Sequence, residues 1–177
     1  MTNQYSGEIL TIASQFKMNP DMLLAQVQVE SGGNTWAWNP EPAYRYLWDV
    51  KKNAPFRTLT AAEQTSEAPP SDFPCFAGDR DQEWWAQQAS WGLLQVMGAV
   101  AREHGFRNNY LVELCDPIQG LSAGCAVMSE LLAWSKGNIE QALSAYNGGR
   151  GGNAVRPFRN QAYADRVLAA HKKLLSA

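Results

Sequence analysis

Apolar residues recur at helical spacing near both ends of this 177-residue chain, and the segment between them breaks the pattern. An apolar residue at every third or fourth position marks the buried face of an amphipathic helix. Helices are predicted at residues 5–17, 20–31, 93–104, 108–114, 118–134, 138–147 and 160–175. The pattern therefore predicts a mainly α fold, and the length suits a single helical domain over residues 1–177.

Residues 34–90 form the interruption and are rich in proline and aromatic residues. We expect a loop-rich aromatic insertion there, with at most a short helix or hairpin, and a small β-element is an open alternative. Near its end, Asp79 and Gln82 have the spacing of a capping box for a helix through Trp84 and Trp85. The acids of this segment do not predict a calcium loop, because the turn glycine and the distal glutamate of such a loop are missing.

The predicted helix over residues 20–31 ends in an unusual carboxylate. Asn19 and Pro20 are typical of a helix start, and Gly32 of a helix end. Glu30 follows Leu23 by nearly two turns and so continues the apolar face of this helix. Burial raises the pKa of a carboxyl group, and a glutamate that keeps its proton near neutral pH can act as a general acid. The alternatives are that Glu30 turns to solvent at the helix end or pairs with an arginine.

Charge and composition exclude several other functions. A net charge of -2 leaves no electrostatic footprint for nucleic acid. The chain has no apolar run of about 18 residues, so no membrane span is expected, and its start does not resemble a signal peptide. Three cysteines without CxxC spacing favour free buried thiols over a disulfide framework or a zinc site. A bridge between Cys115 and Cys125 stays open.

Short motifs spread over about residues 20–170 occur in the order typical of one family. The first is Glu30-Ser31-Gly32 followed by Asn39-Pro40, the second Gly92-Leu93-Leu94-Gln95, and the third the run from Ala142 through Tyr146-Asn147 to Gly149. Fainter matches are Asp116-Pro117 with Gly124, where Gly120 and Val127 replace the usual Asn and Tyr, and Tyr163 with Val167-Leu168. Together they resemble the soluble lytic transglycosylase family, which is related to goose-type lysozymes.

The resemblance implies a lysozyme-like α+β version of the helical fold and an activity on peptidoglycan glycan strands. The family cleaves the β-1,4 bond between N-acetylmuramic acid (MurNAc) and N-acetylglucosamine (GlcNAc). Glu30 would first protonate the glycosidic oxygen and then act as base, so that a 1,6-anhydro-MurNAc end forms. Most glycosidases need two carboxylates, whereas this chemistry uses one. It needs no metal or organic cofactor.

The matched motifs also imply supporting residues. Tyr146 would donate a hydrogen bond to Glu30, or else be a core aromatic. Gln95 and Asn147 would reach sugar hydroxyl or N-acetyl groups, or else cap a helix or fix a loop. Ser31 would contact substrate or only end its helix, and Tyr163 is counted among the substrate-binding residues. Gly92 should permit a close approach of another backbone segment.

The long insertion departs from the family pattern. Its aromatic residues could form an extended glycan groove or a small core of the insertion itself, and any single residue is more often in a core. The family acts on the cell wall, in the periplasm or outside the cell. Without a visible signal peptide, a bacteriophage enzyme, a virion-associated enzyme or a domain of a longer protein would fit. We expect a monomer.

Two other functions stay open. A hydrolytic goose-type muramidase would need a second polar group to position water, and Asp49 or Glu41 could offer one. A non-catalytic wall-binding module would have no reason to keep Glu30, Gln95, Tyr146 and Asn147 together.

Overall fold

The computed structural model describes residues 4–76 and 78–176, which fall into two compact units. Unit 1 combines the residues up to Asn34 with those from Gly124 onward, and unit 2 covers Thr35–Ala123. Helix makes up 51% of the structure and a small antiparallel sheet accompanies it, which confirms the mainly α prediction and the small β-element. That the chain is organised as one domain stays a prediction.

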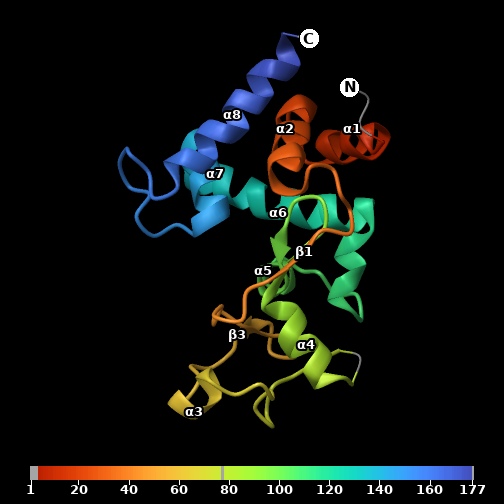
Figure 1. The fold of residues 1–177 in the computed structure, drawn as a ribbon, viewed down its shortest axis with the longest axis vertical. Coiled ribbons are helices and arrows are strands. Elements are labelled where there is room, and N and C mark those ends of the chain that lie inside the picture. The colour runs from red at the N-terminus through yellow and green to blue at the C-terminus, as the bar shows by residue number, and fades with distance from the viewer. Residues whose placement is uncertain (1–3, 77, 177) are drawn as a thin grey trace. The chain divides into compact units, whose positions relative to one another are not determined.

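Unit 1 is helical. Its helices are α1 (Ser6–Gln15), α2 (Pro20–Ser31), the part of α6 (Pro117–Trp134) from Gly124 onward, α7 (Ile139–Gly148) and α8 (Gln161–Leu175). Helix α2 packs along α8, while α1 packs on α2 and α7 on α8 (Figure 1). These bounds match the predicted ranges to within about two residues, because each of these helices has a clear apolar period or cap.

Local chemistry explains where α2 begins and ends. The Asn19 side chain accepts a hydrogen bond from the Met22 backbone N–H at 3.0 Å, which satisfies one of the unpaired donors of the first turn. Pro20 takes the first helical position, where its missing N–H costs nothing. Gly32 then adopts a left-handed conformation with φ of 62° and ends the helix one residue after Ser31.

The loop between α7 and α8 is organised around one buried asparagine. The Asn153 side chain accepts hydrogen bonds from the Ser144 hydroxyl at 2.6 Å and the Arg159 backbone N–H at 3.1 Å. Its amide nitrogen donates to the Gly149 carbonyl at 2.7 Å. One fully buried side chain thus ties both ends of the loop to α7, which fixes where α8 begins.

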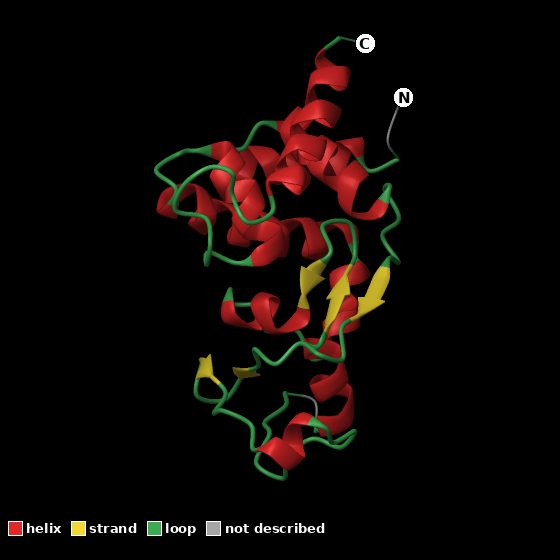
Figure 2. Cartoon of the chain, turned by 60° about the vertical axis from the view of Figure 1, so that its left-hand side comes forward, coloured by secondary structure: helices red, strands yellow, loops and turns green. Residues whose placement is uncertain are grey.

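Unit 2 contains the strands of the structure as well as short helices. Strands β1 (Trp38–Pro40), β4 (Ala89–Trp91) and β5 (Val96–Met97) form an antiparallel sheet in the order β1-β4-β5, and β2 (Trp48–Asp49) pairs with β3 (Ala54–Pro55). Figure 2 shows the three-stranded sheet in yellow. The helices are α3 (Ala61–Gln64), α4 (Arg80–Gln87), α5 (Gly98–Glu103) and the 3-10 helix η1 (Leu111–Cys115). The Asp79 carboxylate accepts from the Gln82 backbone N–H at 2.9 Å, so α4 starts where predicted.

Two predicted helices of unit 2 were wrong in part. The range 93–104 is helical only from Gly98, because residues before it form a turn and strand β5. The range 108–114 is a 3-10 helix over Leu111–Cys115 rather than an α-helix. In both places short-range periodicity resembled a helix. At Val96 and Met97, antiparallel pairing with the neighbouring strand β4 decided the structure instead.

Buried leucine and aromatic residues of the insertion form its own small core. Leu47, Leu59, Phe73 and Trp84 cluster there, with Phe56 packed against them. The Phe73 ring meets the Trp84 ring edge-to-face with centroids 5.1 Å apart. Other aromatic residues, including Trp36, Trp38 and Trp85, are exposed. Some aromatic residues of the insertion therefore form a core. Only the exposed ones can line the glycan groove that the sequence suggested.

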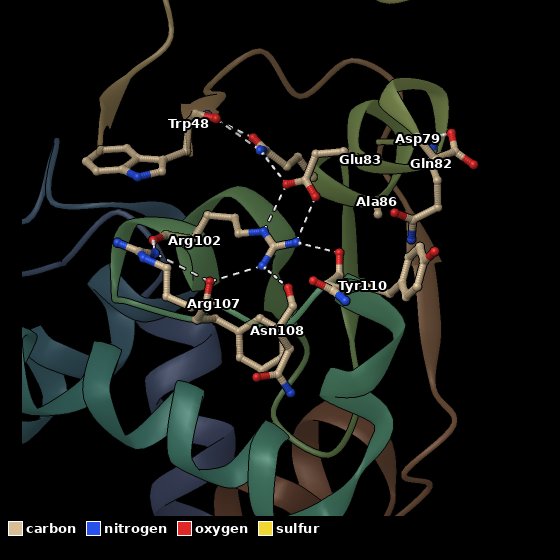
Figure 3. A network of polar contacts seen from close by, with 12 residues as sticks. Trp48, Asp79, Gln82, Glu83, Ala86, Arg102, Arg107, Asn108 and Tyr110 are labelled. Atoms are coloured by element: carbon tan, nitrogen blue, oxygen red, sulfur yellow. Dashed lines mark hydrogen bonds and ion pairs between the residues drawn. The ribbon is translucent and has the colours of Figure 1, made fainter. Parts of the chain in front are cut away.

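A buried ion pair connects α4 to α5. The Arg102 guanidinium is fully buried and donates to both carboxylate oxygens of Glu83, at 2.9 and 2.7 Å. It also donates to the backbone oxygens of Phe106 and Asn108 (Figure 3). Gln87 extends this network, since its amide nitrogen donates to Glu83 at 2.9 Å. Both charges are thus paired and hydrogen-bonded, the condition under which charged groups are tolerated in a core.

The three cysteines are free thiols, as the favoured interpretation of the sequence expected, but Cys75 is only half-buried. Cys115 and Cys125 are both buried, and burial raises the pKa of the Cys125 thiol to about 12. A thiol that holds its proton so firmly is a poor nucleophile and a poor metal ligand.

Candidate active site

Glu30 lies in the last turn of α2 as a half-buried residue, and its carboxyl group is the part shielded within unit 1. The same helix buries Leu23 and Val27 in the core, as the apolar spacing predicted. Because Glu30 shares that face, its carboxyl group is directed toward neighbouring helices rather than into bulk water. The solvent-exposed alternative for Glu30 therefore does not hold.

The hydroxyl group that bonds Glu30 comes from α8. Tyr163 Oη donates to Glu30 Oε1 at 2.5 Å, although the two residues are 133 positions apart in the sequence. Tyr163 is only 3% exposed, so this bond is shielded from water. Gln26, one turn before Glu30 on α2, donates to the same hydroxyl oxygen at 3.4 Å. The Tyr163 hydroxyl is thereby oriented with its proton toward the carboxylate.

Burial controls the proton affinity of Glu30. Loss of solvation raises the pKa of Glu30 to about 7, while the hydrogen bond from Tyr163 and the charge of Arg166 oppose the rise. The Arg166 guanidinium lies over the Tyr163 ring, 5.8 Å from its centroid. A carboxyl group with a pKa near 7 is partly protonated at neutral pH and can both give and take a proton there.

Tyr146 is a second phenol close to this carboxyl group. Burial raises the pKa of Tyr146 well above its ordinary value, and the negative charge of Glu30 raises it further. Both effects keep the Tyr146 hydroxyl protonated. The charge of Glu30 thus reaches the Tyr146 hydroxyl, and the position over the catalytic centre that the motif implied for Tyr146 stays a prediction. Its hydrogen bond to Glu30 stays a prediction, whereas the bond from Tyr163 is present in the structure.

The other predicted contacts in unit 1 have structural partners. The Ser31 hydroxyl donates to the Val27 carbonyl at 3.1 Å and accepts from the Gly33 backbone N–H at 3.2 Å, which suits a residue that ends a helix. Asn147 is exposed, and its carboxamide lies 3.1 Å from that of Asn160. These bonds hold both side chains in place, and their contact with substrate stays a prediction.

Gln95 belongs to unit 2 and closes the turn between β4 and β5. It adopts a left-handed φ of 46°, and its amide nitrogen donates to the carbonyl oxygens of Ala37 and Gly92 at 3.0 and 2.9 Å. Its amide oxygen accepts from the Ser90 hydroxyl at 3.0 Å. The contacts fit the loop-fixing alternative, and a role in sugar binding remains a prediction.

Gly92 confirms the expected close backbone approach. A Cβ atom at Gly92 would lie 2.3 Å from the carbonyl oxygen of Leu114, and its φ of 70° is left-handed. Only glycine fits both requirements at this position.

Two residues of the site were not predicted. Gln26 precedes Glu30 by four residues, so helical spacing alone places both on one face of α2. Arg166 follows Tyr163 by three residues and shares its face of α8 in the same way. Each could have been found by extending the search one helical turn from the motif residue.

Among residues 4–76 and 78–176, no group of three or more His, Cys, Asp or Glu side chains is arranged to hold a metal ion. No helix in those ranges is long and apolar enough to cross a membrane.

A comparison with protein families adds an independent finding. A family model described as the transglycosylase SLT domain matches residues 8–167, which include α2 with Glu30 and about the first two turns of α8 with Tyr163.

Proposed function

The chain belongs to the transglycosylase SLT family, and from that premise we propose that it is a lytic transglycosylase with Glu30 as its single catalytic acid and base. Family membership makes peptidoglycan its substrate class and the cell wall its place of action. The finer proposal is cleavage of the β-1,4 bond between MurNAc and GlcNAc, with a 1,6-anhydro-MurNAc end as product.

The observation that carries this proposal is the buried carboxyl group of Glu30, whose pKa is about 7. In the first step, protonated Glu30 donates its proton to the glycosidic oxygen. The C1–O4 bond breaks, GlcNAc leaves with that proton, and positive charge develops at C1 of the muramoyl sugar. The substrate's own acetamido group can stabilise this charge. A group with a pKa near the working pH suits this step, because it is both available in its acid form and ready to release the proton.

In the second step, the Glu30 carboxylate removes the proton from the C6 hydroxyl of the muramoyl sugar. The C6 oxygen bonds to C1 and closes the anhydro ring, so Glu30 regains the proton that it lost. Tyr163 supports this step, because its hydroxyl donates to the carboxylate and stabilises the charged form between the two proton transfers. No second carboxylate and no added water are required.

The test compares wild type with Glu30→Gln on purified sacculi, with mass spectrometry of the released sugar ends. Wild type should release ends that are one water lighter than reducing ends, and Glu30→Gln should release none while still binding glycan. Glu8→Gln on α1 is the matched control and should cleave like wild type. Reducing ends instead of anhydro ends would identify a hydrolytic muramidase. Cleavage by Glu30→Gln at the wild-type rate would refute the assignment of the acid.

A further inference from the structure

Unit 2 contains a pocket of about 380 Å³ that the proposed chemistry does not use. Its wall combines three indoles with acidic and amide side chains: Trp38, Trp85, Trp91, Asp79, Asp81 and Gln82. The residues come from β1, β4 and the first two turns of α4, including its N-cap. Its volume is within the range of small-ligand sites in proteins.

The tryptophans of this pocket are held in place yet remain open to solvent. Trp38 and Trp91 are directly opposite each other across β1 and β4, with ring centroids 6.1 Å apart and planes inclined by 39°. Trp38 is 57% exposed and Trp85 on α4 is 43% exposed. Large apolar side chains gathered at one exposed place usually mark a binding site, whereas a single exposed one needs no explanation.

This pocket is on the opposite side of the sheet from Gln95. Successive side chains of a strand point to opposite faces, and Ser90 precedes Trp91 on β4. The Ser90 hydroxyl bonds Gln95, so the Trp91 ring is directed to the other face, where α4 packs. The pocket is therefore separate from Gln95, the residue of unit 2 that the family motif associates with substrate.

The lining groups give the pocket a negative character. Asp79 and Asp81 supply two carboxylates. Their two negative charges outweigh the partial positive charge of roughly half a unit at the start of α4. The neighbouring guanidinium of Arg80 is bonded to the Ser71 carbonyl oxygen, and both of those residues line a different pocket. The indole N–H of Trp91 donates to the Ala86 carbonyl at 2.9 Å, so this donor is already used within the protein. Carboxylates and indole faces both attract cations.

We propose that this pocket binds the side-chain ammonium group of the diamino acid in a peptidoglycan stem peptide. The inference rests on the proposed function for its choice of ligand, since it takes the wall as the place where the protein works. An ammonium group has three hydrogen-bond donors and no acceptor, which matches a wall of carboxylates and π faces. The alkyl chain that carries it packs against the indoles. The enzyme would thereby favour stem peptides whose side-chain amine is free, because a crosslink converts the amine of the acceptor stem into an amide.

The experiment measures binding of the stem tripeptide Nα-acetyl-L-alanyl-γ-D-glutamyl-L-lysine, whose one ammonium group is on the lysine side chain, by NMR through the indole N–H signals of the protein. Signals of Trp38, Trp85 and Trp91 should shift saturably. The same tripeptide acetylated on its side-chain amine should bind at least tenfold more weakly. Trp85→Ala and Asp81→Asn should each weaken binding by about fivefold, the effect of losing one partly desolvated cation contact. Both residues are exposed and lie at the surface, so these variants should keep the fold.

Matched controls are available within the chain. Trp36→Ala removes an indole that is 72% exposed and does not line the pocket, and Asp21→Asn removes a first-turn aspartate of another helix. Both should bind the tripeptide like wild type. Equal binding of the acetylated tripeptide would overturn the inference, and so would chitotetraose shifting the same indole signals more strongly than the tripeptide. Binding to an isolated peptide does not depend on cleavage, so a failure of the proposed function would appear separately, as missing anhydro ends.

Discussion

Replacing Glu30 by glutamine should make the protein more stable at neutral and alkaline pH while it abolishes cleavage. The reason is that the folded chain holds the ionised carboxylate in a site that favours the neutral form. Glutamine is nearly isosteric and carries no charge. Its side-chain oxygen can still accept the hydrogen bond from Tyr163, so the buried hydroxyl keeps a partner.

The size of the effect follows from the pKa of Glu30. That pKa rises from 4.5 to about 7 on folding, and each pKa unit corresponds to about 1.36 kcal/mol. After allowance for partial solvent screening, Glu30 costs the wild type about 2–3 kcal/mol of folding free energy above pH 7. The folded state binds more protons than the unfolded state between these two pKa values, so wild-type stability falls as pH rises through that window. Below pH 4.5 the cost disappears, because both states are protonated.

Urea denaturation followed by circular dichroism at pH 4.5, 6 and 8 would measure this difference. Glu30→Gln should match wild type at the lowest pH and exceed it by about 2–3 kcal/mol at pH 8, with a melting temperature higher by about 4–12 °C. Glu8→Gln serves as the control and should not show this pH-dependent gain. A stability difference that is the same at all three pH values, or a variant less stable at pH 8, would refute the reasoning.

Three further predictions concern other contacts. Tyr163→Phe removes a hydrogen bond that opposes the effect of burial, so the pKa of Glu30 should rise above 7. The alkaline limb of the pH profile of cleavage should then move to higher pH, and a limb that stays in place or moves to lower pH would contradict this. Arg102→Leu leaves the Glu83 carboxylate buried without its partner and should cost about 3–5 kcal/mol in urea denaturation, whereas a loss below about 1 kcal/mol would show that the pair is dispensable. Gly92→Ala combines a left-handed backbone with a Cβ atom 2.3 Å from a carbonyl oxygen, and should lower stability by about 2–5 kcal/mol in the same assay; wild-type stability would mean that the neighbouring backbone yields easily.

The helices of unit 1 could be predicted because their signals are local. Asn19, Pro20 and Gly32 mark both ends of α2 by their own backbone preferences. The burial of Glu30 followed from its spacing after Leu23 on the same helix. Helix caps and apolar spacing involve residues within one or two helical turns of each other, so they can be recognised in a single sequence.

The rest depended on contacts between distant segments. Strand β4 is only three residues long, and its pairing with β1, far earlier in the chain, rather than its composition decides that it is a strand. The hydrogen bond from Tyr163 to Glu30 depends on how α8 packs on α2, which no motif in the sequence specifies. The pairing of Glu83 with Arg102, 19 residues apart on two helices, has no short-range pattern at all.

Unit 1 is assembled from the two ends of the chain, and this has a consequence for the order in which a ribosome makes the protein. Glu30 is synthesised early, but the phenol that bonds it belongs to a helix made more than a hundred residues later. A nascent chain therefore carries Glu30 as an ordinary exposed glutamate until α8 has been made. The raised proton affinity of Glu30 arises only when α8 has emerged and docked, so a chain interrupted before α8 would lack the acid that the proposed cleavage requires.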